Sequence, residues 1–319
     1  MYRRLFLVDF GIRALNQEAN HESPDREQPW TVLRLLQWTT EFFRSKGSES
    51  PRLDAEILLA HARSCSRVEL YTSYAVEPSE EQRVAFREMV RRRGSGMPVA
   101  QIVGFREFYS LSFRVSEATL IPRPETEHLV VEALDCMKRL PNHNDKHVLA
   151  DIGTGSGAIG VTLAKHLPEV KLVATDISED ALAIAKWNAQ KNEVSDQIDF
   201  IQSDLLQQVV EPNEFSMICS NPPYITEKEF MELEPTVREF EPKSALVSGP
   251  EGTEIIDRII KLCEDRLMLG GFCVIEMSPM IAEACMKLAE RSNLFDELAY
   301  IKDLSGHRRL LRMRRRGDA

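Results

Sequence analysis

The chain has 319 residues, a length that suggests about two domains, and its apolar and charged fractions, 43% and 28%, are ordinary for a soluble globular protein. The formal net charge of −10 argues against a protein that wraps nucleic acid with its whole surface, so we expect no stable nucleic-acid partner. No apolar run approaches the ~20 residues of a membrane span, and we expect no membrane partner either.

Cysteine usage and the N-terminus indicate the compartment. The six cysteines are scattered without a C-x-x-C pair, which favours reduced thiols and a cytoplasmic protein. Residues 1–29 are expected to form an extension. Met1 to Leu15 carries arginines but no long apolar region or small-residue cleavage site. Asp9 and the acidic stretch after Glu18 fit a transit peptide poorly, so a mitochondrial location is only the alternative. His143 and His147 belong to a polar stretch, where a loop is favoured and no metal site is expected.

Residues 30–97 are predicted to form a small helical domain. Apolar residues recur at helical spacing from Trp30 to Phe43, and a second helix begins with Ser50 at the N-cap and Pro51 at the first helical position. A further helix is expected from Ser79 to about Arg93. No catalytic cluster is found in this part, and we interpret the apolar stripes of its helices as core.

Over residues 98–122 the spacing of apolar residues changes from helical to alternating. This segment is predicted to form a β-hairpin that links two domains. Phe108, Leu111, Phe113 and Val115 alternate with polar residues, and Tyr109-Ser110 is the expected turn. The two prolines of the Ile121 to Glu127 segment then favour an extended chain before a helix that starts near Glu125.

Residues 123–319 form the remaining predicted domain, in which strands and helices alternate from His147 onward. This pattern indicates an α/β fold with a parallel, doubly wound sheet. The expected strands are Val148–Ile152, Lys171–Asp176, Ile198–Gln202, Phe215–Cys219 and Gly271–Met277. The expected helices lie near Gly157–His166, Asp180–Asn192, Thr253–Leu267 and Met280–Ser292. Two final strands, Ala299–Leu304 and His307–Met313, are predicted to form an antiparallel hairpin that closes the sheet.

The first of these strands runs into a glycine-rich sequence, Asp151-Ile152-Gly153-Thr154-Gly155-Ser156-Gly157-Ala158-Ile159-Gly160. Glycines let the backbone turn sharply and approach a ligand, and the helix that follows offers free N–H groups. The spacing Gly155-x-Gly157-x-x-Gly160 also matches the dinucleotide fingerprint, with an acid about 20 residues further on at Asp176. Binding of NAD is therefore one alternative.

Acidic residues that end three successive strands favour S-adenosylmethionine instead. A carboxylate at Asp151 would repel a pyrophosphate but attract the ammonium group of a methionine moiety. Asp176 can accept hydrogen bonds from both ribose hydroxyls, and Asp204 can accept one from the adenine amino group.

The segment Ser220-Asn221-Pro222-Pro223-Tyr224 follows a strand that is predicted to be buried. Proline has no N–H to donate to a sheet, so the chain must turn away here and leave backbone carbonyls without ladder partners. These carbonyls, an amide side chain and an aromatic ring then lie at the carboxyl end of a strand, where ligands bind in open α/β sheets. The alternative is a plain strand-ending turn.

Together, Gly153 to Gly157, Asp176, Asp204 and the Asn221 to Tyr224 motif resemble a class I methyltransferase of the amino-methylating kind. That kind includes DNA adenine, guanine-N2 rRNA and protein-glutamine enzymes.

Other segments narrow the resemblance to the HemK/PrmC family of peptide chain release factor glutamine N5-methyltransferases. They are Ser50 to His61, Met97 to Gly104, Ile121 to Glu127 and Glu241 to Leu246. The resemblance runs from about Trp30 to Met313. The Ile-Pro-Arg-Pro-Glu-Thr-Glu string is specific in combination with Asn-Pro-Pro-Tyr, whereas either alone is weak.

The resemblance implies a class I, Rossmann-like methyltransferase sheet with an antiparallel C-terminal hairpin. The β-hairpin would join this sheet to the helical domain over residues 30–97, which the resemblance makes a substrate-recognition domain. It implies methyl transfer from S-adenosylmethionine to the side-chain amide of a glutamine, in the Gly-Gly-Gln loop of class-1 peptide release factors. The partner is then a protein, and we expect a monomer. The implied cofactor-binding residues are Asp151, Gly153, Thr154, Gly155, Ser156, Gly157, Asp176, Ile177, Asp204, Leu205 and Asn221.

The implied catalytic residues are Asn221, Pro222 and Tyr224. The Asn221 side-chain oxygen and the Pro222 carbonyl would accept the N–H groups of the substrate amide, and Tyr224 would pack on its plane. The same segment, with Pro223, Arg123 and Glu125, forms the implied substrate site. For Arg123 and Glu125 an ion pair that joins the two domains is an equal alternative.

Two alternative functions remain at this point: a nucleic-acid amino-methyltransferase acting on adenine N6 or guanine N2, and a non-catalytic adaptor that binds S-adenosylmethionine. One stretch departs from the family pattern. Glu276-Met277-Ser278-Pro279-Met280 stands where Glu-x-Gly-x-x-Gln is usual, which puts the packing behind the site in doubt.

Overall fold

The computed structural model describes residues 29–140, 147–211 and 214–317. The chain divides into two compact units, of which the first ends at Arg87 and the second begins at Glu88. The predicted extension over residues 1–29, except its last residue, lies outside the described residues, as does His143. The predicted domain limits at residues 97 and 122 stay predictions.

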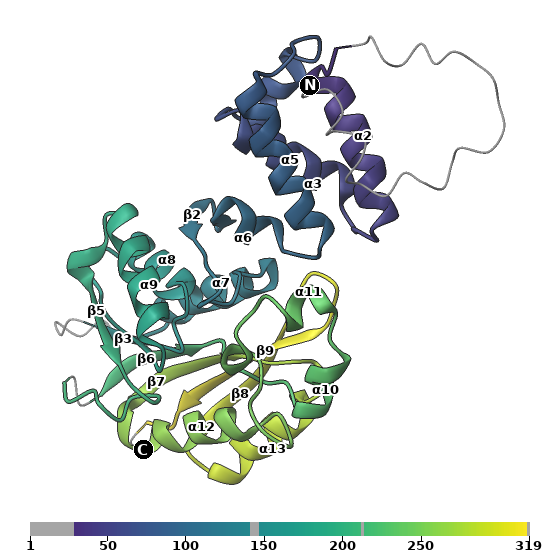
Figure 1. Ribbon diagram of the computed structural model, residues 1–319. Helices are drawn as coiled ribbons and strands as arrows, with labels where there is room; N and C mark the ends of the chain where they lie inside the picture. The colour runs from purple at the N-terminus through teal and green to yellow at the C-terminus, as the bar shows by residue number, and fades with distance from the viewer. Residues whose placement is uncertain (1–28, 141–146, 212–213, 318–319) are drawn as a thin grey trace. The chain divides into compact units, whose positions relative to one another are not determined.

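The described part of the first unit is helical (Figure 1). Its helices are α2 (Val32–Ser45), α3 (Pro51–Ala62) and α4 (Arg67–Thr72), and α5 (Glu80–Gly94) crosses the division between the units. The Thr31 hydroxyl caps α2 by accepting from the Arg34 N–H. Helix α4 lies outside the predicted helices, although Ser66 and Glu69 form a capping box at its start.

The predicted β-hairpin is shorter than expected, because its first residues form helix α6 (Val99–Val103). Gly104 ends this helix at φ +81°, and its N–H bonds to the Ala100 carbonyl. Strand β1 (Phe105–Phe108) then pairs antiparallel with β2 (Leu111–Arg114). The predicted turn at Tyr109-Ser110 is confirmed, with both residues at positive φ.

A seven-stranded sheet of order β5-β4-β3-β6-β7-β9-β8 forms the centre of the second unit. Its strands are β3 (Val148–Ile152), β4 (Lys171–Asp176), β5 (Ile198–Gln202), β6 (Phe215–Ser220), β7 (Leu267–Glu276), β8 (Phe295–Lys302) and β9 (Arg308–Arg315). The pairs among β3 to β7 are parallel, whereas β9 runs antiparallel to both β7 and β8. The predicted parallel sheet with an antiparallel C-terminal hairpin is confirmed.

The later strands are longer than predicted. Strand β7 begins at Leu267 rather than Gly271, directly after helix α12 (Glu254–Arg266), because Leu267 pairs with Phe215 across an irregularity in the register. The strands β8 and β9 also extend beyond the predicted hairpin.

Helices cover both faces of the sheet (Figure 1). Helices α7 (Glu127–Met137), α8 (Ala158–His166) and α9 (Glu179–Lys191) lie on one face, and α12 with α13 (Ala282–Ser292) lies on the other. Alternate strand residues serve the two cores: in β6, Met217 and Cys219 pack into the first and Ile218 into the second. All three are fully buried, as expected for a strand covered on both sides.

Short elements follow β6 and were not predicted. They are α10 (Glu227–Glu232), α11 (Pro235–Arg238) and a 3₁₀ turn at Lys243–Ala245. A second 3₁₀ turn, Pro124–Thr126, precedes α7. Residues of the two 3₁₀ turns lie at the edge of the sheet where the strand order reverses. From β3 the chain builds outward to β4 and β5, then returns to β6 on the other side of β3. Such a reversal opens a crevice at the carboxyl ends of the strands.

Candidate active site

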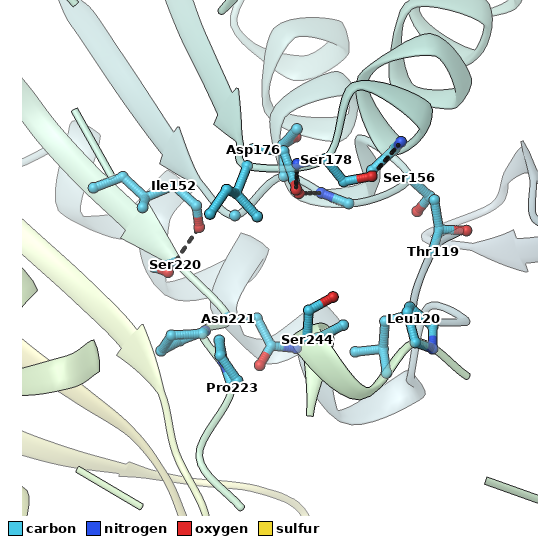
Figure 2. Close-up of a pocket in the computed structure, with 18 of the residues that line it drawn as sticks. Thr119, Leu120, Ile152, Ser156, Asp176, Ser178, Ser220, Asn221, Pro223 and Ser244 are labelled. Carbon is cyan, nitrogen blue, oxygen red and sulfur yellow. Dashed lines mark hydrogen bonds between the residues drawn. The ribbon is translucent and has the colours of Figure 1, made fainter. Parts of the chain in front are cut away.

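A cavity of about 380 Å³ lies at this reversal point. Figure 2 shows its labelled side chains, with Asp176 and Ser178 on one side and Asn221, Pro223 and Ser244 on the opposite side. The predicted site residues that line it are Arg123, Gly153, Thr154, Gly155, Ser156, Asp176, Ile177, Asp204, Leu205, Asn221, Pro222 and Pro223. Four others, Glu125, Asp151, Gly157 and Tyr224, are not among its lining residues.

Asp151 lies behind the glycine-rich loop rather than on the cavity wall. Its carboxylate is fully buried, and Oδ2 accepts from the Thr154 hydroxyl at 2.6 Å and from the Gly160 N–H at 2.9 Å. These bonds hold the loop that lines the cavity. The other oxygen, Oδ1, has no hydrogen-bond partner among the described residues.

Burial raises the pKa of Asp151 to about 6 from an ordinary 3.8, although the bonds from Thr154 and Gly160 lower it. The folded protein therefore binds this proton more tightly than the unfolded chain, so stability falls as the pH rises from about 4 through about 6. For the ligand-free protein, we expect Asp151→Asn, which mimics the neutral acid, to remove that fall. Between pH 5 and pH 8 the wild type should lose about 1–1.5 kcal/mol relative to the variant in urea unfolding. Parallel stability curves would contradict this.

Gly157 is not among the lining residues, and its close packing accounts for the glycine, while its predicted contact with a cofactor stays a prediction. It adopts φ +82°, and a Cβ at this position would lie 3.2 Å from the Cβ of Ala185 and 3.2 Å from Cγ2 of Val161. The glycine therefore lets the start of α8 lie close against α9. The other loop glycines lining the cavity also need positive φ, +70° at Gly153 and +56° at Gly155.

Asp176 ends β4 and faces the cavity with both oxygens already anchored. Its Oδ2 accepts from the Gly155 N–H and Oδ1 from the Ser178 N–H, each at 2.9 Å. Burial raises its pKa, while these backbone bonds lower it. Each carboxylate oxygen keeps a further lone pair for a ligand hydroxyl. The exposed side chain of Ile177 follows at once and lines the same wall.

Asp204 has a partner that the sequence does not predict. Its Oδ2 accepts from Arg258 at 2.7 Å, and Arg258 comes from α12, beyond β6. Both side chains are partly exposed and both line the cavity. Asp204 can therefore accept a bond from a ligand only with the lone pairs that Arg258 leaves free.

The Asn221 side chain is held at one end. Its Nδ2 donates to the Thr126 hydroxyl oxygen at 3.2 Å, and Thr126 also lines the cavity. No hydrogen bond between described residues ends on Asn221 Oδ1 or on the Pro222 carbonyl. The Asn221 Oδ1 and the Pro222 carbonyl oxygen are therefore two adjacent acceptors, at the edge of the cavity, that can bind a ligand.

Tyr224 lies largely buried beside this pair. Burial, reinforced by the nearby Glu276 carboxylate, raises the pKa of its phenol to about 12, so the hydroxyl keeps its proton at neutral pH. The predicted role of Tyr224 against a substrate amide stays a prediction.

Arg123 pairs with Glu241 rather than with Glu125. The Glu241 Oε1 accepts from Arg123 at 2.5 Å, and Oε2 accepts from the Ile121 N–H at 3.4 Å. The Glu241 side chain is buried and that of Glu125 is exposed. Since Arg123 and Glu241 belong to the same compact unit, this ion pair fixes a wall of the cavity and does not join two domains.

Several lining residues were missed by sequence reasoning. They include Thr119, Leu120, Thr126, Ser178, Ser244, Ala245 and Arg258. Thr126 lies within the Ile121 to Glu127 string and Ser244 within the Glu241 to Leu246 string, so the resemblance held a signal for both. No sequence signal pointed to Arg258, because a single arginine on an amphipathic helix is ordinary.

Two family models match the chain. The first, the PrmC N-terminal domain, matches residues 34–104, and the second, the Methyltransferase small domain, matches residues 133–240. A release factor glutamine methyltransferase of Rhodopirellula baltica is 58% identical over 289 residues, which cover 91% of this chain and 98% of that protein. The chain belongs to the release factor glutamine methyltransferase family.

Two further members of this family share less of the sequence. A release factor glutamine methyltransferase of Koribacter versatilis is 41% identical, covering 79% of this chain and 88% of that one. Another, of Bacillus cereus, is 32% identical over a match that covers 88% of this chain and 98% of that protein. The predicted HemK/PrmC resemblance is confirmed, and the chain is an S-adenosylmethionine-dependent methyltransferase. The NAD alternative is therefore wrong.

Solved structures support the fold at low identity. The hMettl16 catalytic domain in complex with MAT2A 3′UTR hairpin 6 gives a TM-score of 0.53 at 17% identity, covering 73% of this chain and 83% of that one. A human methyltransferase 10 domain containing protein gives a TM-score of 0.50 at 19% identity, and the match covers 73% of this chain and 98% of that one. The predicted class I methyltransferase fold is confirmed.

The residues present fit the cofactor of this family. The Asp176 carboxylate at the end of β4 suits a ribose, and Ile177 and Leu205 offer apolar surface for a base. The buried Oδ1 of Asp151, unpartnered among the described residues, lies behind the loop and suits a cationic group that it reaches through a water. None of the helices in the described part of the chain is long and apolar enough to span a membrane.

Proposed function

We propose that this methyltransferase acts on the side-chain amide of a glutamine, in the Gly-Gly-Gln loop of a class-1 peptide release factor. The observation that carries the proposal is the acceptor pair formed by Asn221 Oδ1 and the Pro222 carbonyl at the cavity edge. A primary amide has two N–H groups on one nitrogen, and two adjacent acceptors match them. The names of the relatives, at up to 58% identity, agree with this substrate.

When bound, S-adenosylmethionine supplies a methyl group on a positively charged sulfur. Asn221 and Pro222 would accept the two N–H groups of the amide and so orient its nitrogen toward the cavity. An amide nitrogen is a poor nucleophile because its lone pair is delocalised into the carbonyl. The same two oxygens would stabilise the positive charge that develops on this nitrogen, a preorganised electrostatic effect. Tyr224 would restrict the angle at which the planar amide enters.

The assay that tests this function uses the full chain, S-adenosylmethionine and a purified class-1 release factor, with mass spectrometry of the Gly-Gly-Gln peptide. We expect one added methyl group on the glutamine, and none when that glutamine is replaced by alanine. Parallel reactions with tRNA, rRNA and DNA test the nucleic-acid alternative. Methylation of a nucleic acid in place of the release factor would overturn the proposal, as would cofactor binding with no methylation of any substrate, which would favour the adaptor.

We also propose that the protein is a cytoplasmic monomer with no stable nucleic-acid partner. The net charge of −10 and the scattered cysteines support this. Light scattering coupled to gel filtration tests the oligomeric state.

A further inference from the structure

Asn188 is a polar side chain that is completely buried in helix α9, a setting in which asparagine is uncommon. Its amide forms three hydrogen bonds, all of them with backbone groups. Nδ2 donates to the Ser156 carbonyl at 2.7 Å and to the Arg114 carbonyl at 3.0 Å, and Oδ1 accepts from the Arg114 N–H at 2.7 Å. Both ends of the amide are therefore in use, and a flipped amide would face two carbonyl oxygens with its own oxygen.

The bond to Ser156 holds the glycine-rich loop. Ser156 lines the cavity, and no other hydrogen bond between described residues ends on its carbonyl. In a continuous helix this carbonyl would accept from the Gly160 N–H, but that N–H donates to Asp151 instead. Without Asn188 the Ser156 carbonyl would be buried with no partner, so the loop would have to change its conformation to satisfy it.

The two bonds to Arg114 hold strand β2 of the hairpin. The Val115 N–H bonds to the Gly104 carbonyl, so the neighbouring Arg114 turns its own N–H and carbonyl away from β1, as alternate residues of an antiparallel pair do. The Asn188 amide takes up both of these groups, as a residue of a further strand would. The hairpin is thereby fixed to α9 at the point where β2 ends.

Asn188 therefore joins two segments that both line the cavity. The chain that follows β2 lines it at Thr119 and Leu120, and Figure 2 shows these side chains and Ser156 along one side of the cavity. Asn188 lies 74 positions from Arg114 and 32 from Ser156 in the sequence, so local chain geometry sets neither contact. We propose that Asn188 is a positioning residue for the cofactor, which holds the glycine-rich loop and the wall after β2 together in the conformation that binds S-adenosylmethionine.

A positioning role affects cofactor binding as well as folding. When only a fraction of the molecules hold the loop in its binding conformation, the apparent affinity falls by that fraction. A residue that served the core alone would lower the unfolding temperature and leave the affinity of the folded protein unchanged. The acceptor substrate takes no part in this effect, which is therefore independent of the proposed function.

The test uses the full chain with Asn188→Leu, which keeps the approximate size of the side chain and removes all three bonds. Calorimetry with S-adenosylmethionine gives the Kd, at a temperature at which circular dichroism shows the variant to be folded. We expect the Kd to rise by about 10-fold or more, as for a loop that holds its binding conformation in about a tenth of the molecules. The unfolding temperature of the ligand-free variant, measured separately, reports the loss of stability.

Asn192→Leu is the matched control, because it makes the same chemical change at the C-terminal end of the same helix. The Asn192 side chain bonds to the Ser112 carbonyl of the hairpin and to the Asn188 carbonyl, and neither bond reaches the glycine-rich loop. We expect its Kd to stay within about two-fold of wild type, as for most substitutions away from a site. A Kd within two-fold of wild type in Asn188→Leu would overturn the proposal, as would an equal rise in Asn192→Leu. If Asn188→Leu does not fold, Asn188→Ala is measured in its place and decides by the same two outcomes.

Discussion

Asn221→Ala is expected to lower kcat for glutamine methylation by about 10²–10³-fold, the usual consequence of removing one preorganised partner of a developing charge. The variant loses the acceptor that faces the cavity and leaves Thr126 without its 3.2 Å partner. Binding of S-adenosylmethionine should persist, since the loop over Gly153 to Ser156 and Asp176 form a separate wall of the cavity. Single-turnover rates with a release factor, and calorimetry with the cofactor, measure the two effects independently.

Asn192→Ala is a suitable control for this variant. Asn192 lies at the C-terminal end of α9 and does not line the cavity, and its side chain bonds to the carbonyls of Asn188 and Ser112. We expect this change to leave kcat within about two-fold, as for most substitutions away from a site. Near-normal turnover in Asn221→Ala would remove Asn221 from the mechanism. A loss of cofactor affinity as large as the loss of rate would place it in the cofactor site instead.

Asp176→Ala is expected to weaken binding of S-adenosylmethionine by about 10²-fold or more. A hydrogen bond to a charged group contributes about 1.5–3 kcal/mol, and each 1.4 kcal/mol changes the affinity tenfold. Two such bonds to the ribose hydroxyls are proposed. The carboxylate also accepts from the Gly155 and Ser178 N–H groups, so its removal releases the glycine-rich loop as well.

Calorimetry with S-adenosylmethionine measures this effect, and Asp180→Ala is the matched control. Asp180 carries the same charge in the first turn of α9, is exposed and does not line the cavity. Its loss should change the affinity by less than about three-fold, because an exposed charge at a helix N-terminus contributes about 0.3–1 kcal/mol. Unchanged affinity in Asp176→Ala would contradict the assignment of the ribose site.

Much of the second unit is predictable because its signals are local. The short apolar runs in Val148–Ile152 and Lys171–Asp176 give strands whose bounds agree with β3 and β4, since a strand buried on both faces contributes side chains to two cores. The sharp turn at Gly153 and Gly155 was also predictable from local sequence, because the positive φ of each glycine depends only on its own turn. Helix α6 was missed because five residues carry too short a period to separate a helix from a strand.

The sequence by itself placed Asp176, Asp204 and Asn221 at the carboxyl edge of the sheet, because strand ends are set by local pattern and by the prolines after β6. Only the tertiary structure decided what each of them touches. Asp151 holds the glycine-rich loop by accepting from Thr154. Asp204 accepts from Arg258, and Asn221 donates to Thr126. These partners are separated by loops and helices whose lengths no pattern constrains, and a hydrogen bond depends on tenths of an ångström that only packing can fix.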